Sequence, residues 1–407
     1  MDVFIDLLAL LILTRVLGEA AERLRQPASA GEILAGVLLA LLALNYGDVI
    51  PFAVELVNSK ILIYTADIGI FCLVFLAGIE TEPKEIVKHF GESFVVAAGG
   101  IVVPLLAGFA LAWSFLPESD HRQSLALLTG IVMSITAVPA TAKILQEFNL
   151  IHTRLGQVIM GAALFDDVIG LFLLAVLLAL IDTGNVPDVV TFGLLVAKVF
   201  AFFAITILLG VHVYPRVSRG LNTMQATSLE FSALAMVGLA YGLLAESLGM
   251  HWILGAFMAG LFFERPRVGV RSYNEVRLIF TAVTHGMLAP LFFASIGLRF
   301  DPNALISIPF FLALLLLIAF VGKIAGCGIP ALLVGLPRRD ALAVGIGMST
   351  RGAVGFVVLS IAYNAGLFEM ADHTHPITTH LFSGLVLMAV LTTMLAPALL
   401  RWLQPKG

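Results

Sequence analysis

The chain has 407 residues, of which 60% are hydrophobic and only 12% are charged. Soluble globular proteins carry roughly 25% charged residues, so this composition excludes an ordinary soluble domain and indicates a polytopic membrane protein. The formal net charge of −4 says little about partners, because the positions of the charges matter more than their sum. The two cysteines, Cys72 and Cys327, lie in apolar segments and predict neither a disulfide framework nor a metal site.

Apolar segments along the chain predict an all-α protein with thirteen membrane-spanning helices. The first begins at the N-terminus, which starts acidic and lacks the basic region of a cleaved signal peptide. The expected helices cover residues 2–24, 31–44, 61–80, 92–116, 123–147, 155–181, 189–214, 225–248, 251–264, 277–299, 303–335, 339–366 and 378–402.

Basic residues gather in alternate connections between these spans, which is the pattern expected of cytoplasmic loops. The connections on the opposite side hold only Lys60, Arg122 and Arg299, accompanied by acidic residues such as Asp120 and Glu369. The basic residues of the first set are Arg23, Arg25, Lys84, Lys88, Lys143, Arg154, Arg216, Arg219, Arg265, Arg267, Arg271, Arg277, Arg338, Arg339, Arg401 and Lys406. We therefore expect the N-terminus outside and the C-terminus in the cytoplasm, with no soluble regulatory domain after the last span.

Short motifs recur in the two halves of the chain. GEILAGVLLAL (31–41) resembles WILGAFMAGLF (252–262), and FLAGIETEPKEI (75–86) resembles FFASIGLRFDPNAL (292–305). The members of each pair fall on opposite sides of the membrane in the expected topology. Six spans, one linker span and six further spans would produce such inverted repeats, which are typical of secondary transporters with a site near the midplane.

Two spans at corresponding places contain residues that interrupt helices. Proline removes a backbone donor and glycine weakens a helix, and freed backbone groups at membrane depth find partners only inside a protein. The helix-break residues are Thr136, Pro139 and Thr141 in the fifth span, and Ser349, Thr350 and Arg351 in the twelfth. We expect two discontinuous, crossed helices in the core; the plainer alternative for either span alone is a kinked helix.

Asp166 and Asp167 lie side by side in the apolar sixth span. A carboxylate at mid-membrane costs about 3 kcal/mol on insertion scales, and two neighbouring carboxylates repel each other, so we expect this pair to bind protons or cations. The two side chains differ by about 100° around a helix, which lets one pair with a basic group while the other faces an aqueous cavity.

Lys323 is the expected partner of the aspartates, because it is the only lysine deep within the core spans of the second half. A snorkelling Lys323 and a purely structural salt bridge are the plainer alternatives. The sequence leaves two roles open for Arg351: it either offsets the partial negative charge of carbonyls exposed at the break or pairs with an acid.

Together these motifs resemble those of bacterial monovalent cation/proton antiporters. The resemblance covers nearly the whole chain and is strongest to the double-aspartate, thirteen-span sodium/proton antiporters of the cation:proton antiporter family. It is carried, in order, by FLAGIET, TAVPATAKILQEF, GAALFDDVIGL, PLFFASIGLRFD, VGKIAG and GMSTRGAVGF.

The resemblance implies a transporter rather than an enzyme, needing no cofactor and binding no nucleic acid, which exchanges Na⁺ or Li⁺ for H⁺ across the bacterial inner membrane in pH homeostasis. It implies a homodimer whose scaffold or dimerisation helices lie at 1–91 and 184–302, and the second of these ranges also contains the linker. The core transport domain would comprise 92–183 and 303–407 and move like an elevator, with usually electrogenic transport.

The resemblance also assigns roles to the charged residues. Asp167 is then the ion-binding and proton-carrying aspartate, Asp166 pairs with Lys323, and the transported Na⁺ contacts Asp167, Asp166 and Thr136. Two positions depart from the family pattern: Ala353 stands where many relatives have glutamate, and Ala137 stands where serine is common.

Three other functions are alternatives to Na⁺/H⁺ exchange. A K⁺/H⁺ antiporter shares the same membrane fold. A cation channel needs a continuous pore lined by carbonyls or charges, which broken helices and inverted repeats argue against. An intramembrane aspartyl protease needs its two aspartates on separate helices, whereas Asp166 and Asp167 are adjacent.

Overall fold

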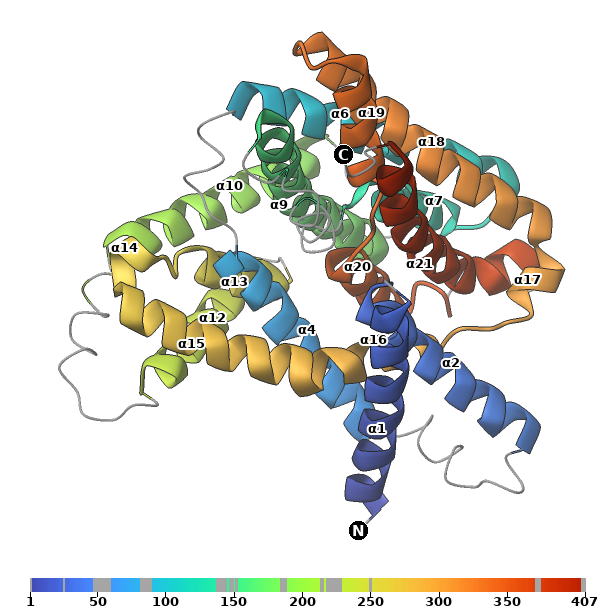
Figure 1. Ribbon diagram of the computed structural model, residues 1–407, viewed down its shortest axis with the longest axis horizontal. Helices are drawn as coiled ribbons and strands as arrows, with labels where there is room; N and C mark the ends of the chain where they lie inside the picture. The colour runs from blue at the N-terminus through green and yellow to red at the C-terminus, as the bar shows by residue number, and fades with distance from the viewer. Residues whose placement is uncertain are drawn as a thin grey trace. The chain divides into compact units, whose positions relative to one another are not determined.

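The structure is a computed structural model that describes residues 2–24, 26–46, 60–80, 90–136, 145, 150, 153–183, 189–212, 216, 229–248, 251–369 and 375–403. Within these ranges every regular element is a helix and there is no strand (Figure 1). The expected all-helical class is confirmed. The chain forms two compact units: residues 1–17, 32–83 and 187–297 make the first unit, and residues 18–31, 84–186 and 298–407 make the second unit.

Membrane-length helices are present in both units. Five helices are long and apolar enough to cross a bilayer: Phe90–Phe115, Arg154–Ile181, Val270–Leu298, Pro309–Leu333 and Pro376–Leu400. Four shorter apolar helices are Ala28–Leu44, Ala197–His212, Phe231–Ser247 and Val354–Asn364. These counts refer to the described ranges only, and the number of thirteen spans stays a prediction.

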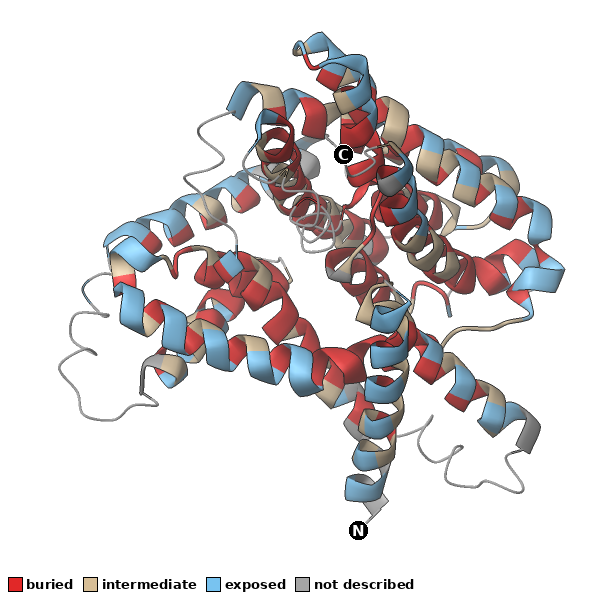
Figure 2. Cartoon of the chain, viewed as in Figure 1, coloured by how far each residue is buried: buried red, intermediate tan, exposed pale blue. Residues whose placement is uncertain are grey.

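The helix α18 (Pro309–Leu333) shows why these elements suit a membrane. It buries Leu315, Ala319 and Lys323 along one face, while its other face exposes Leu317 and Val321 (Figure 2). Because both faces are apolar apart from Lys323, the exposed side has no polar surface to offer water. This is the pattern of a helix that faces lipid on one side and protein on the other.

The first unit is built on α4 (Lys60–Glu80), which packs against α13 (Ile253–Leu261). The other helices that lie wholly or largely in this unit are α10 (Val189–His212), α12 (Leu229–Ser247), α14 (Arg265–Val268), α15 (Val270–Val283), the π turn η1 (Thr284–Leu288) and α16 (Ala289–Leu298). Two further helices, α1 (Asp2–Arg23) and α2 (Ala28–Tyr46), contribute residues to both units.

The expected span 277–299 begins seven residues too late, because α15, η1 and α16 form one continuous helix from Val270. Its first turns are amphipathic: Tyr273 and Val276 are buried, whereas Arg271 and Glu275 form an exposed ion pair. Such a polar face lowers the average hydropathy of the segment, so hydropathy places the start of this helix too late.

Glycines make the same kind of helix crossing twice within the first unit. A Cβ atom at Gly78 would lie 3.0 Å from Gly260 Cα, and a Cβ atom at Gly297 would lie 3.0 Å from Gly36 Cα. Only glycine permits backbones to approach so closely. Gly78 and Gly297 belong to the recurring motifs FLAGIETEPKEI and FFASIGLRFDPNAL, whereas Gly36 and Gly260 belong to GEILAGVLLAL and WILGAFMAGLF. In each crossing, a glycine of the first motif pair therefore packs against a glycine of the second pair. The inversion of the repeats stays a prediction.

The second unit contains the remaining long helices. The helix α18 packs against α6, α19 and α21, and α7 packs against α6, α9 and α20 (Figure 1). Their bounds are α6 Phe90–Phe115, α7 Arg122–Ser134, α9 Arg154–Thr183, α17 Ala304–Ser307, α19 Arg338–Gly347, α20 Ala353–Asn364 and α21 Pro376–Leu403. The expected span 303–335 is divided into α17 and α18 at Ile308, because the following Pro309 disfavours helical geometry in the residue before it.

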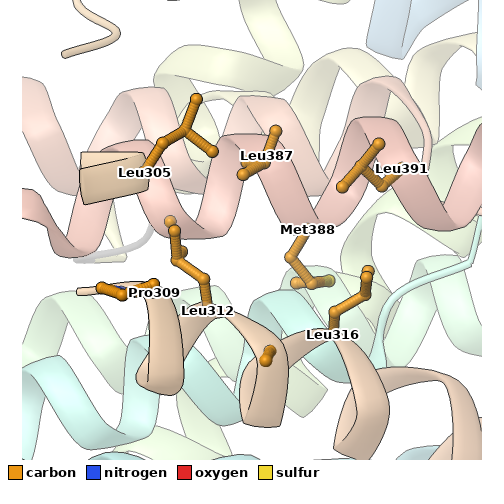
Figure 3. A pocket seen from close by; sticks show the side chains of 9 residues that line it. Leu305, Pro309, Leu312, Leu316, Leu387, Met388 and Leu391 are labelled. Atoms are coloured by element: carbon orange, nitrogen blue, oxygen red, sulfur yellow. The ribbon is translucent and has the colours of Figure 1, made fainter. Parts of the chain in front are cut away.

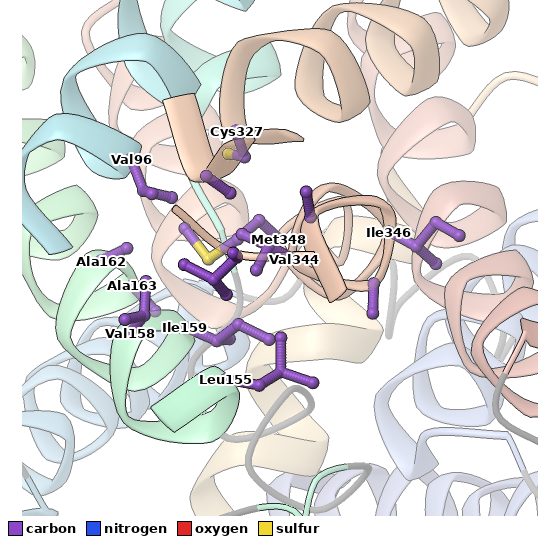
Figure 4. Close-up of a cluster of buried hydrophobic side chains, with 14 of the residues drawn as sticks. Val96, Leu155, Val158, Ile159, Ala162, Ala163, Cys327, Val344, Ile346 and Met348 are labelled. Carbon is purple, nitrogen blue, oxygen red and sulfur yellow. The ribbon is translucent and has the colours of Figure 1, made fainter. Parts of the chain in front are cut away.

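A buried apolar cluster joins five of the described helices of the second unit, namely α6, α9, α18, α19 and α21 (Figure 4). Its members include Val96 of α6, Ala162 of α9, Cys327 of α18, and Val344 and Met348 from the end of α19. Between membrane helices such burial stabilises the unit through close van der Waals packing, because lipid tails are as apolar as these side chains.

The twelfth expected span is discontinuous. The helix α19 ends at Gly347, and α20 begins at Ala353. In the fifth expected span, α7 ends at Ser134 and Ile135 is extended, with φ −74° and ψ 140°. Pro139 and Thr141 lie outside the described residues, so the structure does not describe how the chain continues from that break.

Candidate functional site

The aspartate pair lies midway along α9, within the second unit. Asp166 has 0% and Asp167 has 4% of its surface exposed. On α18, Lys323 is likewise fully buried. Two helix crossings on α6 bring these groups within reach of each other. A Cβ atom at Gly326 of α18 would lie 2.6 Å from Gly99 O of α6, and a Cβ atom at Gly161 of α9 would lie 2.9 Å from Ser93 Cβ of α6.

The Lys323 ammonium has three acceptors. Its Nζ lies 2.6 Å from Asp166 Oδ2 and 2.9 Å from Gly100 O, and it also donates to Ser134 O, at the end of α7. An ammonium has three N–H donors, so all three are used. The structure therefore brings Lys323 and Asp166 together and excludes the alternative in which Lys323 snorkels to a membrane surface.

Thr136 stands at the end of the described part of the fifth span. Its hydroxyl contacts Asp166 Oδ2 and lies 3.1 Å from Met348 O, at the second break. A hydroxyl carries a single hydrogen, so it donates to only one of these acceptors at a time. Thr136 thus links the two breaks to the aspartate.

Arg351 binds backbone carbonyls. Its Nη1 atom donates to Ser349 O at 2.5 Å. Its Nη2 atom donates to Met133 O at 2.5 Å and to Ala319 O at 3.1 Å. It is 1% exposed, and its side chain makes no ion pair with an acid that the structure describes. Of the two roles left open by the sequence, the structure selects the carbonyl one.

Helix ends explain why two cations gather here. The C-terminal ends of α7 and α19 both leave carbonyls without helical partners and carry a partial negative charge. Met133 O and Ser134 O are such carbonyls, and Ser349 O lies in the break just beyond the end of α19; Lys323 or Arg351 donates to each of the three. The cations therefore compensate the helix ends as well as one carboxylate.

Two carboxylate oxygens lack partners. Asp166 Oδ1 and Asp167 Oδ1 are buried and accept no hydrogen bond from any residue that the structure describes. Asp166 is held only through Oδ2, whereas Asp167 makes no side-chain hydrogen bond or ion pair within the described ranges. Oxygen atoms of this kind are the ligands that Na⁺ and H⁺ both use.

The other expected break residues have local roles. Ser349 Oγ donates to Gly345 O at 2.8 Å and Thr350 Oγ1 to Gly347 O at 3.3 Å, both within their own helix end. Sequence reasoning missed the carbonyl groups of Gly100, Met133 and Ala319. No side-chain pattern identifies them, because every residue carries a carbonyl.

A pocket of about 200 Å³ in the second unit has no part in this chemistry. It lies between α17, α18 and α21 and is lined only by apolar or small residues (Figure 3). Its lining residues are Leu305, Pro309, Leu312, Ala313, Leu316, Gly384, Leu387, Met388 and Leu391. Its lining offers no side-chain oxygen or charge to an ion.

A buried carboxylate–ammonium pair beside broken, membrane-length helices is typical of ion-coupled membrane transporters. The sequence matches the transmembrane region of sodium/hydrogen exchangers over residues 7–404, and the chain belongs to that family. The predicted resemblance to monovalent cation/proton antiporters is thereby confirmed, and the family is one of transporters.

Individual relatives match over nearly their whole length. The chain is 27% identical over 401 residues to the Na⁺/H⁺–K⁺ antiporter GerN of Bacillus cereus, covering 98% of this chain and 96% of that one. It is 28% identical over 407 residues to a Na⁺/H⁺ antiporter of Enterococcus hirae, covering 99% and 98%. The sodium proton antiporter MjNhaP1 of Methanocaldococcus jannaschii, solved at pH 8, has a similar fold, with a TM-score of 0.75, 15% identity and coverage of 100% and 99%.

Proposed function

We propose that this protein exchanges Na⁺ or Li⁺ for H⁺ across a bacterial inner membrane, with Asp167 as the carrier of both ions. The observation that carries this proposal is the difference between the two aspartates. Asp166 Oδ2 already contacts Lys323 and Thr136, whereas the Asp167 carboxylate is buried without a partner among the described residues. Asp167 is therefore the carboxylate free to take a proton or a cation.

In the proposed cycle, a proton leaves Asp167 as the cation arrives, and the two compete for the same oxygens. The contact between Asp166 and Lys323 breaks or re-forms in step, so the protonation steps belong to the coupled group rather than to one residue. Asp166 Oδ1 and the Thr136 hydroxyl are the further oxygens that we assign to the cation. The exchange is electrogenic in this proposal, and the core helices carry the site across by an elevator movement within a homodimer.

A second candidate is K⁺/H⁺ exchange. One relative that matches over nearly its whole length is described as a Na⁺/H⁺–K⁺ antiporter, which supports testing K⁺ beside Na⁺ and Li⁺. A cation channel finds less support, because the two C-terminal helix ends at the site are closed by Lys323 and Arg351 rather than opening carbonyls to a pore.

Proteoliposomes with a pH-sensitive dye test the proposal. Wild-type protein is expected to change the internal pH when Na⁺ or Li⁺ is added, and an imposed membrane potential is expected to change the rate. Asp167→Asn keeps the shape of the side chain but cannot cycle between a proton and a cation, so we expect exchange to fall to the level of empty liposomes.

Asp340→Asn is the matched control, because it makes the same chemical change in the first turn of α19, away from the site. It is expected to retain exchange. An Asp167→Asn protein that exchanges Na⁺ at the wild-type rate contradicts the assignment of Asp167. Cation flux that follows the potential without moving protons would instead indicate a channel.

A further inference from the structure

The break between α19 and α20 exposes backbone groups that the bilayer cannot satisfy. Arg351 is at this break and is 1% exposed, so its N–H and C=O need partners within the protein. Neither group is in a regular helix, because α19 ends at Gly347 and α20 begins at Ala353.

One side chain of another helix supplies the partner for both groups. The N–H of Arg351 donates to Thr393 Oγ1 of α21 at 2.9 Å, and the same Oγ1 lies 2.6 Å from Arg351 O. Thr393 Oγ1 also lies 2.7 Å from Ala389 O of its own helix. The hydroxyl accepts one hydrogen bond and donates its single hydrogen to one of the two carbonyls at a time.

This contact leads to the charged site through Arg351. The guanidinium of Arg351 binds Met133 O at the end of α7, and the next residue, Ser134, offers its carbonyl to Lys323. Lys323 in turn holds Asp166. Among the described residues Thr393 makes no hydrogen bond with either aspartate, so we expect its effect on the ion to pass through the position of Arg351.

We propose that Thr393 is a positioning residue for cation binding: its hydroxyl fixes the Arg351 backbone against α21 and so sets where the guanidinium meets the end of α7. This inference rests on the proposed cation/proton exchange. Without the hydroxyl, the Arg351 N–H loses its acceptor. The broken segment then relaxes, and the carbonyls that hold Lys323 move with it.

The neighbouring residue offers a matched control. Thr392 is fully buried in α21, and its hydroxyl bonds only to carbonyls of its own helix, Met388 O at 2.8 Å and Ala389 O at 3.1 Å. Thr392→Val removes a hydroxyl of the same kind at the same depth, but leaves no group of another element without a partner.

The experiment compares Thr393→Val, Thr393→Ser and Thr392→Val in proteoliposomes, with Na⁺ titrated at several pH values and thermal unfolding recorded in detergent. Loss of one buried hydrogen bond is expected to raise the apparent KM for Na⁺ by about 3- to 10-fold in Thr393→Val. Thr393→Ser restores the hydroxyl and is expected to return KM to within about twofold of wild type, as is Thr392→Val. If Thr393→Val does not fold, Thr393→Ala, which removes the hydroxyl together with the γ-methyl group, takes its place.

An unchanged KM in Thr393→Val, or a Thr393→Ser protein as impaired as Thr393→Val, overturns the role of Thr393 while leaving the proposed exchange intact. A KM change matched by Thr392→Val, together with equal losses of thermal stability, also overturns it, because the effect is then a general one of α21. Wild-type protein that exchanges no monovalent cation for protons overturns the proposed function and this inference with it.

Discussion

At the scale of single residues, the site is governed by the cost of burying charge. Lys323 and Asp166 are both fully buried, and Lys323 Nζ lies 2.6 Å from Asp166 Oδ2. A buried ion pair adds little net stability over apolar packing, but removing one partner leaves an uncompensated charge. The pair is therefore better explained by ion binding than by stability, and it makes the protein sensitive to single substitutions.

Lys323→Met is expected to destabilise the protein by about 3–5 kcal/mol, because Asp166 Oδ2 and the carbonyls of Gly100 and Ser134 lose their donor. Thermal unfolding in detergent measures the effect. The double variant Lys323→Met with Asp166→Asn is expected to be more stable than Lys323→Met alone, since the stranded carboxylate is gone.

Lys198→Met serves as the control for Lys323→Met, because Lys198 is a partly exposed lysine in α10. It is expected to unfold near the wild-type temperature. Equal unfolding temperatures for Lys198→Met and Lys323→Met contradict the account given for the ion pair.

At the scale of elements, helix ends and helix crossings are where this chain departs from plain hydrophobic packing. In the second unit, arginines donate to carbonyls at helix C-termini away from the candidate site as well. Arg154 donates to Val334 O at 2.9 Å after α18, and Arg339 to Leu403 O at 2.6 Å at the end of α21. Cations at such ends offset the helix dipole, so basic residues that the sequence assigns to cytoplasmic loops also stabilise helix termini.

The crossing of α4 and α13 predicts a steric requirement at Gly260. A Cβ atom there would lie 2.9 Å from Ile79 N and 3.1 Å from Gly78 Cα, and it would also contact Phe75 O. Gly260→Ala is therefore expected to destabilise the first unit by about 1–3 kcal/mol through overpacking, measured as a lower unfolding temperature.

Gly193→Ala is the control for this crossing, because a Cβ atom at Gly193 of α10 would meet nothing within 4 Å. Alanine favours helix more than glycine does, so this variant is expected to be as stable as wild type or slightly more stable. If Gly260→Ala unfolds at the same temperature as Gly193→Ala, the crossing is not as tight as described.

At the scale of the whole molecule, the distribution of basic residues predicts the orientation in the membrane. The connection between α6 and α7 contains Glu118, which is exposed, and is expected outside; the start of α19 contains exposed Arg338 and is expected in the cytoplasm. The native cysteines, Cys72 and Cys327, are both buried, so they give little background in labelling.

Single cysteines introduced at these two positions test the orientation. In intact cells, a membrane-impermeant maleimide is expected to label Glu118→Cys, and to label Arg338→Cys only after the membrane is permeabilised. The reverse pattern would invert the whole topology, and labelling of both in intact cells would mean that the number of spans between them is wrong.

Much of the candidate site could be predicted from local signals. Asp166, Asp167 and Lys323 stand out because charge in an apolar segment is costly. The predicted break residues Ser349, Thr350 and Arg351 lie between the end of α19 and the start of α20. The limits of the helices were less predictable. Hydropathy missed the start of α15, because one face of its first turns is polar. It also missed the interruption at Ile308, which is caused by the following proline.

The sequence by itself determined that this is a helical membrane protein of the cation/proton antiporter kind, and which acidic and basic residues lie at its centre. Only the tertiary structure decided that Arg351 binds carbonyls of three segments and that Lys323 donates to two backbone carbonyls as well as to Asp166. It alone also decided that the Thr393 hydroxyl binds the backbone of Arg351 at the second break. The physical reason is that a carbonyl becomes an available acceptor only where a helix ends or another helix approaches, and neither condition is written in the side chain that carries it.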